Sequence, residues 1–258
     1  MKKTLLYIQA LALTIVLLGS CRARFYTPNH HPMPLFREKG DFFANASTNL
    51  ATRIDLTGGY ALTDNLGLYA GYGGSTLSNT STDSINNTKE KSKYAGNMFN
   101  MGMGYFLNRK SSEEFRFEIF GDMAIGNYRN SYSGNGPLRY LNGNFIRIGI
   151  MPNIGYTSSE NDLHFGYSIR LSSIAFANDK YNDSAFWKND LERLKRRPNY
   201  GMFEHAFTFR IGGEQLKFQA QIGLQHGLNS DEYVNAIPFI NFTLLAGLCF
   251  NINLLAGK

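Results

Sequence analysis

The sequence predicts an all-β protein, namely a transmembrane antiparallel up-and-down β-barrel of about ten strands with short periplasmic turns and long extracellular loops. The first indication is a period of two in several segments. It is clearest in 115–125, where odd positions are apolar or Gly and Arg116, Glu118 and Asp122 occupy even positions. Successive side chains of a strand point to opposite faces, so this pattern indicates a strand with one apolar and one charged face.

The second indication is the overall hydropathy. The 258 residues are 43% hydrophobic and have a mean hydropathy of −0.27. A helical membrane protein needs apolar runs of roughly 20 residues, whereas a barrel wall is apolar on one face only. The formal charge of +6 is too small to indicate nucleic-acid binding.

The third indication is the regular order of strands, turns and loops. Segment 41–48 is the weakest strand candidate because Phe42 and Phe43 are adjacent, whereas 52–62 alternates clearly. Further strands are expected at 66–72, 99–105, 115–125, 145–156, 163–171, 203–211, 216–225 and 237–252. Short turns at 63–65, 108–113, 157–161 and 212–213 alternate with long polar loops at 77–93, 127–144 and 175–199. Outer-membrane barrels show this asymmetry between turns and loops.

The N-terminus has the composition of a signal peptide. Lys2 and Lys3 precede an apolar run from 5 to 18, which is too short to span a bilayer as a helix, and we assign 1–20 to the signal peptide. The next residues, Leu18-Gly19-Ser20-Cys21, resemble the lipobox of bacterial lipoproteins. We therefore expect Cys21 to carry a lipid. Cys249 is then left without a cysteine partner, so no disulfide is expected.

Residues 21–40 are predicted to be a lipid-tethered periplasmic linker, followed by the barrel at 41–258. Three prolines, at 28, 32 and 34, favour an extended conformation. His30 and His31 lack a third ligand for a metal, which favours a solvated linker. Arg22 and Arg24 make the start of the linker basic, whereas surface-exported lipoproteins of Bacteroidota generally carry acidic residues there. We therefore expect the lipid in the periplasm-facing leaflet.

A family resemblance rests on three short stretches near the N-terminus: Tyr26-Thr27-Pro28-Asn29, Pro34-Leu35-Phe36 with Glu38-Lys39-Gly40, and 59–67. They resemble the opening of a family of Bacteroidota outer-membrane β-barrel lipoproteins. The resemblance covers mainly the first quarter of the chain. It implies an outer-membrane barrel and carries over no reaction, ligand, cofactor or catalytic position.

Charged residues collect on the face predicted to point inward. They are Arg53, Asp55, Arg116, Glu118, Asp122, Arg147, Arg170, Glu204, Arg210 and Lys217. A small barrel is largely filled by its own side chains, so these residues can form a salt-bridged interior. The alternative is a narrow ion or solute path lined by arginine.

Catalysis finds little support in the sequence. Glu118 and Asp122 are four strand residues apart, about 13 Å at the usual rise, which is too far for a catalytic pair. His164 shares the inner face with Ser168 and Arg170, but no Ser-His-acid order or metal-ligand spacing is present. No enzyme activity and no cofactor are expected.

Two outer surfaces are candidates for contact with other proteins. His205 interrupts the outward row of Phe203 and Phe207, and a polar group facing hydrocarbon is disfavoured, so His205 lies either at a protein contact or near the membrane interface. In the loop 175–199, Asp183 or Ser184 begins a short helix with an apolar face of Trp187, Leu191 and Leu194. This face packs either on the barrel mouth or on a partner.

The loops carry two weaker signals. The basic run 195–197 at the end of the loop helix is suited to lipopolysaccharide phosphates. Ser84 and Ser184 lie in Asp-Ser-apolar tripeptides that resemble Bacteroidota O-glycosylation sites. The sequence thus favours a non-catalytic, lipid-anchored barrel acting as a structural or accessory subunit of an outer-membrane protein assembly. The alternative is a small channel or porin-like, surface-binding barrel, and a lipid-modifying enzyme comes third.

Overall fold

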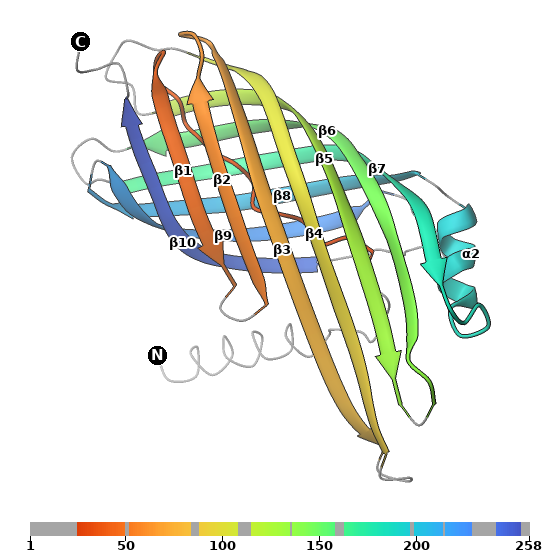
Figure 1. Ribbon diagram of the computed structural model, residues 1–258. Coiled ribbons are helices and arrows are strands. Elements are labelled where there is room, and N and C mark those ends of the chain that lie inside the picture. The colour runs from red at the N-terminus through yellow and green to blue at the C-terminus, as the bar shows by residue number, and fades with distance from the viewer. Residues whose placement is uncertain are drawn as a thin grey trace, which may run out of the picture.

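The computed structural model contains ten antiparallel strands that close into one barrel, which confirms the predicted fold class (Figure 1). It describes residues 25–49, 52–83, 88–107, 115–134, 136–157, 163–196, 199–213, 215–228 and 241–253. The strands are β1 (Asp41–Thr48), β2 (Arg53–Ala61), β3 (Leu66–Asp83), β4 (Thr88–Phe106), β5 (Phe115–Ser133), β6 (Arg139–Thr157), β7 (Leu163–Tyr181), β8 (Asn199–Gly212), β9 (Leu216–Gly227) and β10 (Asn241–Asn253). Each strand pairs with its neighbour in sequence, and β1 pairs with β10 to close the ring.

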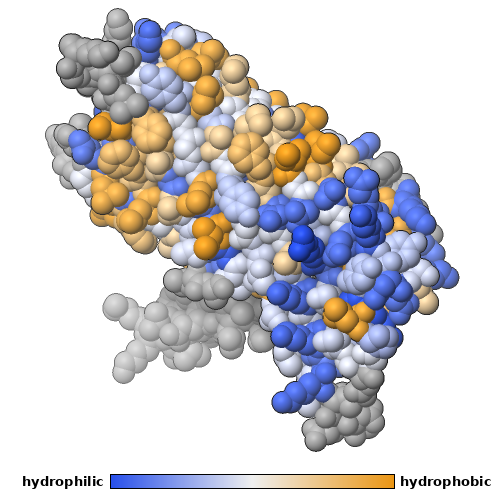
Figure 2. Space-filling model, in the orientation of Figure 1, coloured by the Kyte–Doolittle hydropathy of each residue, from blue (hydrophilic) through white to orange (hydrophobic). Residues whose placement is uncertain are grey.

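The wall follows the predicted alternation. On β5, Ile119, Met123 and Ile125 are exposed on the outer face, whereas Glu118 and Asp122 are buried inside. Outward apolar side chains from neighbouring strands form a continuous band, which Figure 2 shows as an orange belt. This band is the surface that a barrel presents to lipid.

The strands of one side are longer than the sequence predicted. β3 to β7 have 18 or 19 residues each, whereas β1 has 8 and β2 has 9. The expected loop at 77–93 was wrong, because Leu77 to Asp83 pairs with Thr88 to Tyr94. The expected loop at 127–144 is likewise mostly strand, with β5 continuing to Ser133 and β6 starting at Arg139. The outer face of these extensions is polar, although their inner face still buries Tyr94, Tyr128 and Leu141. Backbone pairing therefore continues without the apolar outward positions that mark the rest of the wall.

The described residues contain one helix, α2 (Lys188–Arg196), which lies in the β7–β8 connection. Phe186 donates a backbone hydrogen bond of 3.0 Å to the Asp183 carboxylate just before the helix, so Asp183 caps the turn as predicted. Within the described residues, no helix has the length and apolarity required to cross a bilayer.

The segment from Phe25 to Gly40 contradicts the predicted solvated tether, because it runs through the inside of the barrel. Its residues from Phe25 to Phe36 are buried almost without exception, His30 and His31 included. We call residues 25–36 the plug. The apolar and hydrogen-bonding groups of this segment are buried against the inner wall instead of facing water.

Candidate functional site: the plugged lumen

The plug crosses the lumen from the long-strand end to the short-turn end. Its first residues belong to the same buried cluster as Leu191 of α2 and residues of β5 to β7. Its last residue, Phe36, lies against Gly67 at the start of β3, and Lys39, just after the plug, donates to Asp64 in the β2–β3 turn. The contacts fall into three levels, namely an aromatic level, a charged level and a level of glycine sockets.

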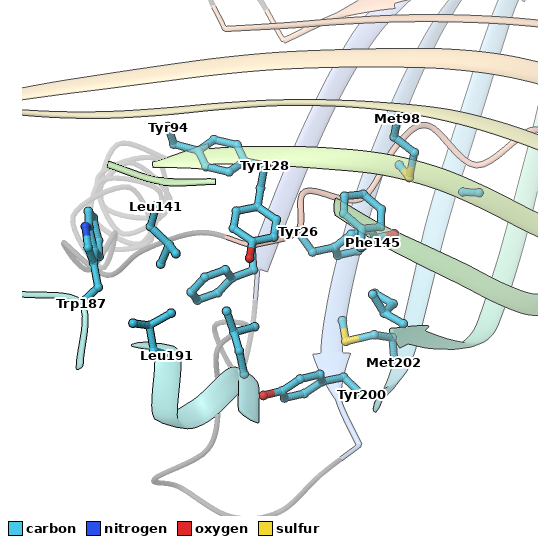
Figure 3. Close-up of a cluster of buried hydrophobic side chains, with 14 residues drawn as sticks. Tyr26, Tyr94, Met98, Tyr128, Leu141, Phe145, Trp187, Leu191, Tyr200 and Met202 are labelled. Atoms are coloured by element: carbon cyan, nitrogen blue, oxygen red, sulfur yellow. The ribbon is translucent and has the colours of Figure 1, made fainter. Parts of the chain in front are cut away.

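The aromatic level closes the long-strand end (Figure 3). Phe25 packs edge-on against Tyr128 at a centroid distance of 5.1 Å, and Tyr26 packs against Phe145 at 5.4 Å. Trp187, just before α2, and Leu191 and Leu194 of α2 belong to the same buried cluster. Of the two alternatives for this face, the structure has the first: the three residues pack on their own barrel mouth and are not available as a partner surface.

The charged level lies next and joins plug and wall. Asp122 accepts hydrogen bonds from Arg147 Nε (3.0 Å) and from Tyr69 (2.5 Å). Arg170 contacts Glu204 at 2.8 Å and Asp122 at 3.4 Å. The plug completes the network, because the Tyr26 hydroxyl donates to Glu204 at 2.7 Å, and the Asn29 side-chain oxygen accepts from Arg147 at 3.0 Å.

The two plug histidines have separate wall partners. His30 Nε2 accepts a hydrogen bond of 2.6 Å from Gln219, and the His30 backbone N–H donates to Asp55 at 3.2 Å. His31 Nδ1 lies 2.9 Å from Ser168 Oγ, while His31 Nε2 lies 3.6 Å from Glu204. No group of three metal-ligating side chains occurs among the residues that the structure describes.

The Ser168–His31–Glu204 arrangement has the order of a nucleophile, a base and an orienting acid, which the sequence did not reveal because His31 was placed outside the barrel. Ser168 is 0% exposed and Glu204 is shared with Arg170 and Tyr26. A nucleophile must reach its substrate. Here a substrate would have to displace the plug before it could reach Ser168. We therefore interpret the contacts of His31 with Ser168 and Glu204 as contacts that hold the plug in place.

The third level uses inward glycines of the wall. Phe36, Leu35 and Met33 sit over Gly67, Gly155 and Gly166, respectively, where a Cβ atom would approach them to 2.6, 2.5 and 2.1 Å. These glycines leave the space that the plug side chains occupy. The Phe36 backbone N–H also donates to Glu118 at 2.8 Å.

The predicted lumen residues lie on the inner face. Arg53 and Asp55 form a buried ion pair, Arg210 donates to Gln219 and to the Met33 carbonyl, and Lys217 donates to the Gly213 carbonyl. Arg116 is only half-buried, near Asp41 and Arg37 at the short-turn end. His164 is buried on the same face and has no described bond to Ser168 or Arg170.

Outside the lumen, His205 lies on the outer face as predicted. Its ring contacts Phe203, Tyr167 and His226, with a centroid distance of 5.6 Å to His226. Ser184 is exposed before α2. Cys21, Ser84 and Arg197 lie outside the described residues.

The plug residues Phe25, Tyr26, Asn29, His31 and Phe36 were missed as site residues. The prolines interrupt any strand-like or helix-like spacing of apolar residues in this segment, so hydrophobic periodicity does not identify it as part of the packed structure. The usable signals were its apolar and aromatic content and the inward glycines of the wall, which require side chains from elsewhere to fill the space.

Comparison with known proteins agrees with the fold. The outer-membrane protease OmpT from Escherichia coli superimposes with a TM-score of 0.51 at 12% identity, over 82% of this chain and 92% of that one. Acinetobacter baumannii CarO2 (TM-score 0.34, 11% identity, 82% and 98% coverage) and the translocator domain of the autotransporter NalP from Neisseria meningitidis (0.39, 14%, 81% and 74%) are more distant. No family model matches the sequence, and no curated protein does.

The closed antiparallel wall, its outward apolar band and the similarity of its fold to OmpT define a β-barrel of the bacterial outer membrane. At such identity the similarity shows the fold alone.

Proposed function

We propose that this chain is a lipid-anchored, non-catalytic and non-conducting barrel that acts as a structural or accessory subunit of an outer-membrane protein assembly. The observation that carries the proposal is the plugged lumen. Buried side chains of the plug and the wall occupy the interior at all three levels. A barrel whose interior is filled in this way presents only its outer face and its ends to other molecules.

The outer face offers a candidate contact at His205. Its Nδ1 atom lies 3.3 Å from the Tyr167 hydroxyl, and His226 lies beside it on β9. Placing two imidazole rings against lipid hydrocarbon costs free energy. A neighbouring protein that hydrogen-bonds to these rings would remove that cost.

Gentle detergent extraction and identification of the co-purifying proteins tests the subunit proposal. We expect a defined partner whose recovery falls in a His205→Phe variant. A Phe117→Leu variant on β5, three strands away, is the matched control and should retain it. Purification of the wild-type chain as a lone monomer under gentle conditions would contradict the proposal.

Lipopolysaccharide is the second proposed contact. Beyond the apolar band, Lys93, Arg129 and Lys180 are exposed on the outward faces of β4, β5 and β7. Arg129 pairs in register with Asn142, and Asn142 pairs with Lys180. The two cations therefore lie on either side of Asn142, at the same height on the outer face of the sheet. Figure 2 shows the hydrophilic region adjoining the apolar band. Cations at this height suit the phosphates of an anionic head group.

The porin-like alternative has the same fold and differs in the lumen. In planar bilayers we expect no single-channel events from the full chain at any voltage, and events from a variant lacking residues 25–36. Without the plug, the charged level is exposed to water, and a water-filled lumen lined by charged side chains conducts ions. If the full chain conducts as the shortened variant does, the porin-like function replaces the one proposed.

The third alternative, a lipid-modifying enzyme, has a genetic test. Deletion of the gene should leave the lipids unchanged. A lost lipid modification that wild type restores and His164→Ala does not would establish catalysis.

A further inference from the structure

We propose that the plug carries the N-terminal end of the mature chain to the cell-surface side of the barrel, so that the lipid on Cys21 enters the outer leaflet. The inference rests on the proposed acylation of Cys21 and adds its position. It reverses the expectation of a lipid in the periplasm-facing leaflet, which depended on a solvated periplasmic tether.

The direction of the plug follows from its contacts in sequence order. Tyr26 packs against Phe145 in the aromatic level, and His31 meets Ser168 in the middle of the lumen. Further along, the Phe36 backbone meets Glu118 and the Lys39 backbone N–H donates to Asp64 in the β2–β3 turn. The contacts progress one way along the barrel, without a return.

The two ends of the barrel are distinguished by their connections. The β2–β3 turn, which the chain contacts just after the plug, has four residues between Ala61 and Leu66. The opposite end carries the strand extensions and α2, where the plug begins. In outer-membrane barrels the short turns face the periplasm and the long connections face the cell exterior. Phe25 therefore lies towards the exterior.

The reach of the chain excludes the other leaflet. Cys21 lies four positions before Phe25. A fully extended chain of four steps spans at most about 14 Å. The apolar band of such a barrel is about 25 Å tall. Phe25 contacts Tyr128 and Phe176. These two residues pair in register with Gly143 and Phe145, so they lie on the long-strand side of the Ile125–Ile146 pair of the apolar band. Cys21 would have to pass the whole band to reach the periplasmic side, and the plug occupies the lumen.

An epitope tag inserted after Arg22 in the full chain tests this position. We expect antibody to bind it on intact cells, as it should bind a control tag in the β3–β4 connection. A control tag in the β4–β5 turn should bind only after permeabilisation. If the tag at Arg22 behaves like the β4–β5 control, the inference is overturned.

Mass spectrometry of the N-terminal peptide separates this inference from the anchor itself. An acylated Cys21 with a hidden tag refutes the position and retains the anchor. An exposed tag on an unacylated chain refutes lipid insertion, because no lipid is then present to enter the outer leaflet.

A cysteine pair gives a second measurement that needs no insertion. A Cβ at Gly73 would lie 3.5 Å from the Asn29 Cβ, which is within the usual disulfide range of about 3.5 to 4.5 Å. It would also lie 2.6 Å from Asp55 Oδ1, so the Asp55 carboxylate must move for the bond to form. In a Cys249→Ala background, Asn29→Cys with Gly73→Cys should form a disulfide in cells. Asn29→Cys with Gly74→Cys is the matched control, because Gly74 faces outward, and it should not. A folded Gly73 pair that retains two free thiols would contradict the threaded plug.

Discussion

The wall and the plug both have to satisfy their backbone hydrogen-bonding groups, and they do so in different ways. The wall satisfies its backbone groups by strand pairing around a closed ring, and its apolar side chains face lipid. The plug has no strand partners within the described residues, and its backbone instead bonds to wall side chains, as at His31 with Gln221 and Phe36 with Glu118. The wall can therefore tolerate changes on its outer face, whereas plug and inner wall depend on individual contacts.

The largest effect is expected where plug and wall share charges. Asp122→Asn keeps the shape but removes the carboxylate that faces Arg147 and Arg170. Loss of one member of a buried ion pair costs about 3–5 kcal/mol, since a charge is left unpaired. We expect a lower denaturant midpoint, measured by the gel-mobility shift of the unheated barrel.

The control for this change is Asp183→Asn, which alters the partly exposed pair with Arg139. It should leave the midpoint of the barrel nearly unchanged. Equal effects at the two sites would show that the charged level is accessible to water, and the plugged interior would have to be abandoned.

A smaller effect is expected at the glycine sockets. Gly67→Val places atoms where the Phe36 ring lies, and overpacking of this kind costs about 1–3 kcal/mol. Gly121→Val on the outer face of β5 is the control, because the nearest atom to its Cβ is the Met103 carbonyl oxygen at 3.7 Å. The gel-mobility midpoint should fall for the first variant alone. A matching fall in both would mean that strand propensity, not the plug, determines the result.

The same contrast explains how far the sequence predicted this structure. Alternation in 115–125 placed Glu118 and Asp122 inside and Ile119 outside, because lipid and lumen impose opposite polarity on a strand. The extension of β3 to Asp83 was missed, since both of its faces are polar. The plug was missed because its partners are remote: Tyr26 bonds to Glu204, 178 residues away, and no local pattern records such a pair.

The candidate site was predictable to a similar degree. The ten inward charges followed from strand phase alone. Their pairing did not, because apart from Arg53 with Asp55 the partners lie on different strands whose register the sequence does not fix. Trp187, Leu191 and Leu194 were identified as one face of a helix, and only the fold shows what that face covers.

The smallest effect concerns the turn that docks α2. The hydrogen bond from the Phe186 backbone N–H, together with Arg139, lowers the pKa of Asp183. A carboxyl whose pKa is lower in the folded state contributes stability above its ordinary pKa of about 4 and loses that contribution as the pH falls through the folded value.

Trp187, the only tryptophan, is buried in the aromatic level and reports the docking of α2 by its fluorescence. Its emission should shift to the red as the pH falls below the ordinary Asp pKa of about 4. Asp183→Ala should show the shift at neutral pH, while Asp64→Ala, at the short-turn end, should not. A wild-type emission that stays constant to pH about 2, well below the ordinary Asp pKa, would show that the aromatic contacts alone hold α2 on the barrel.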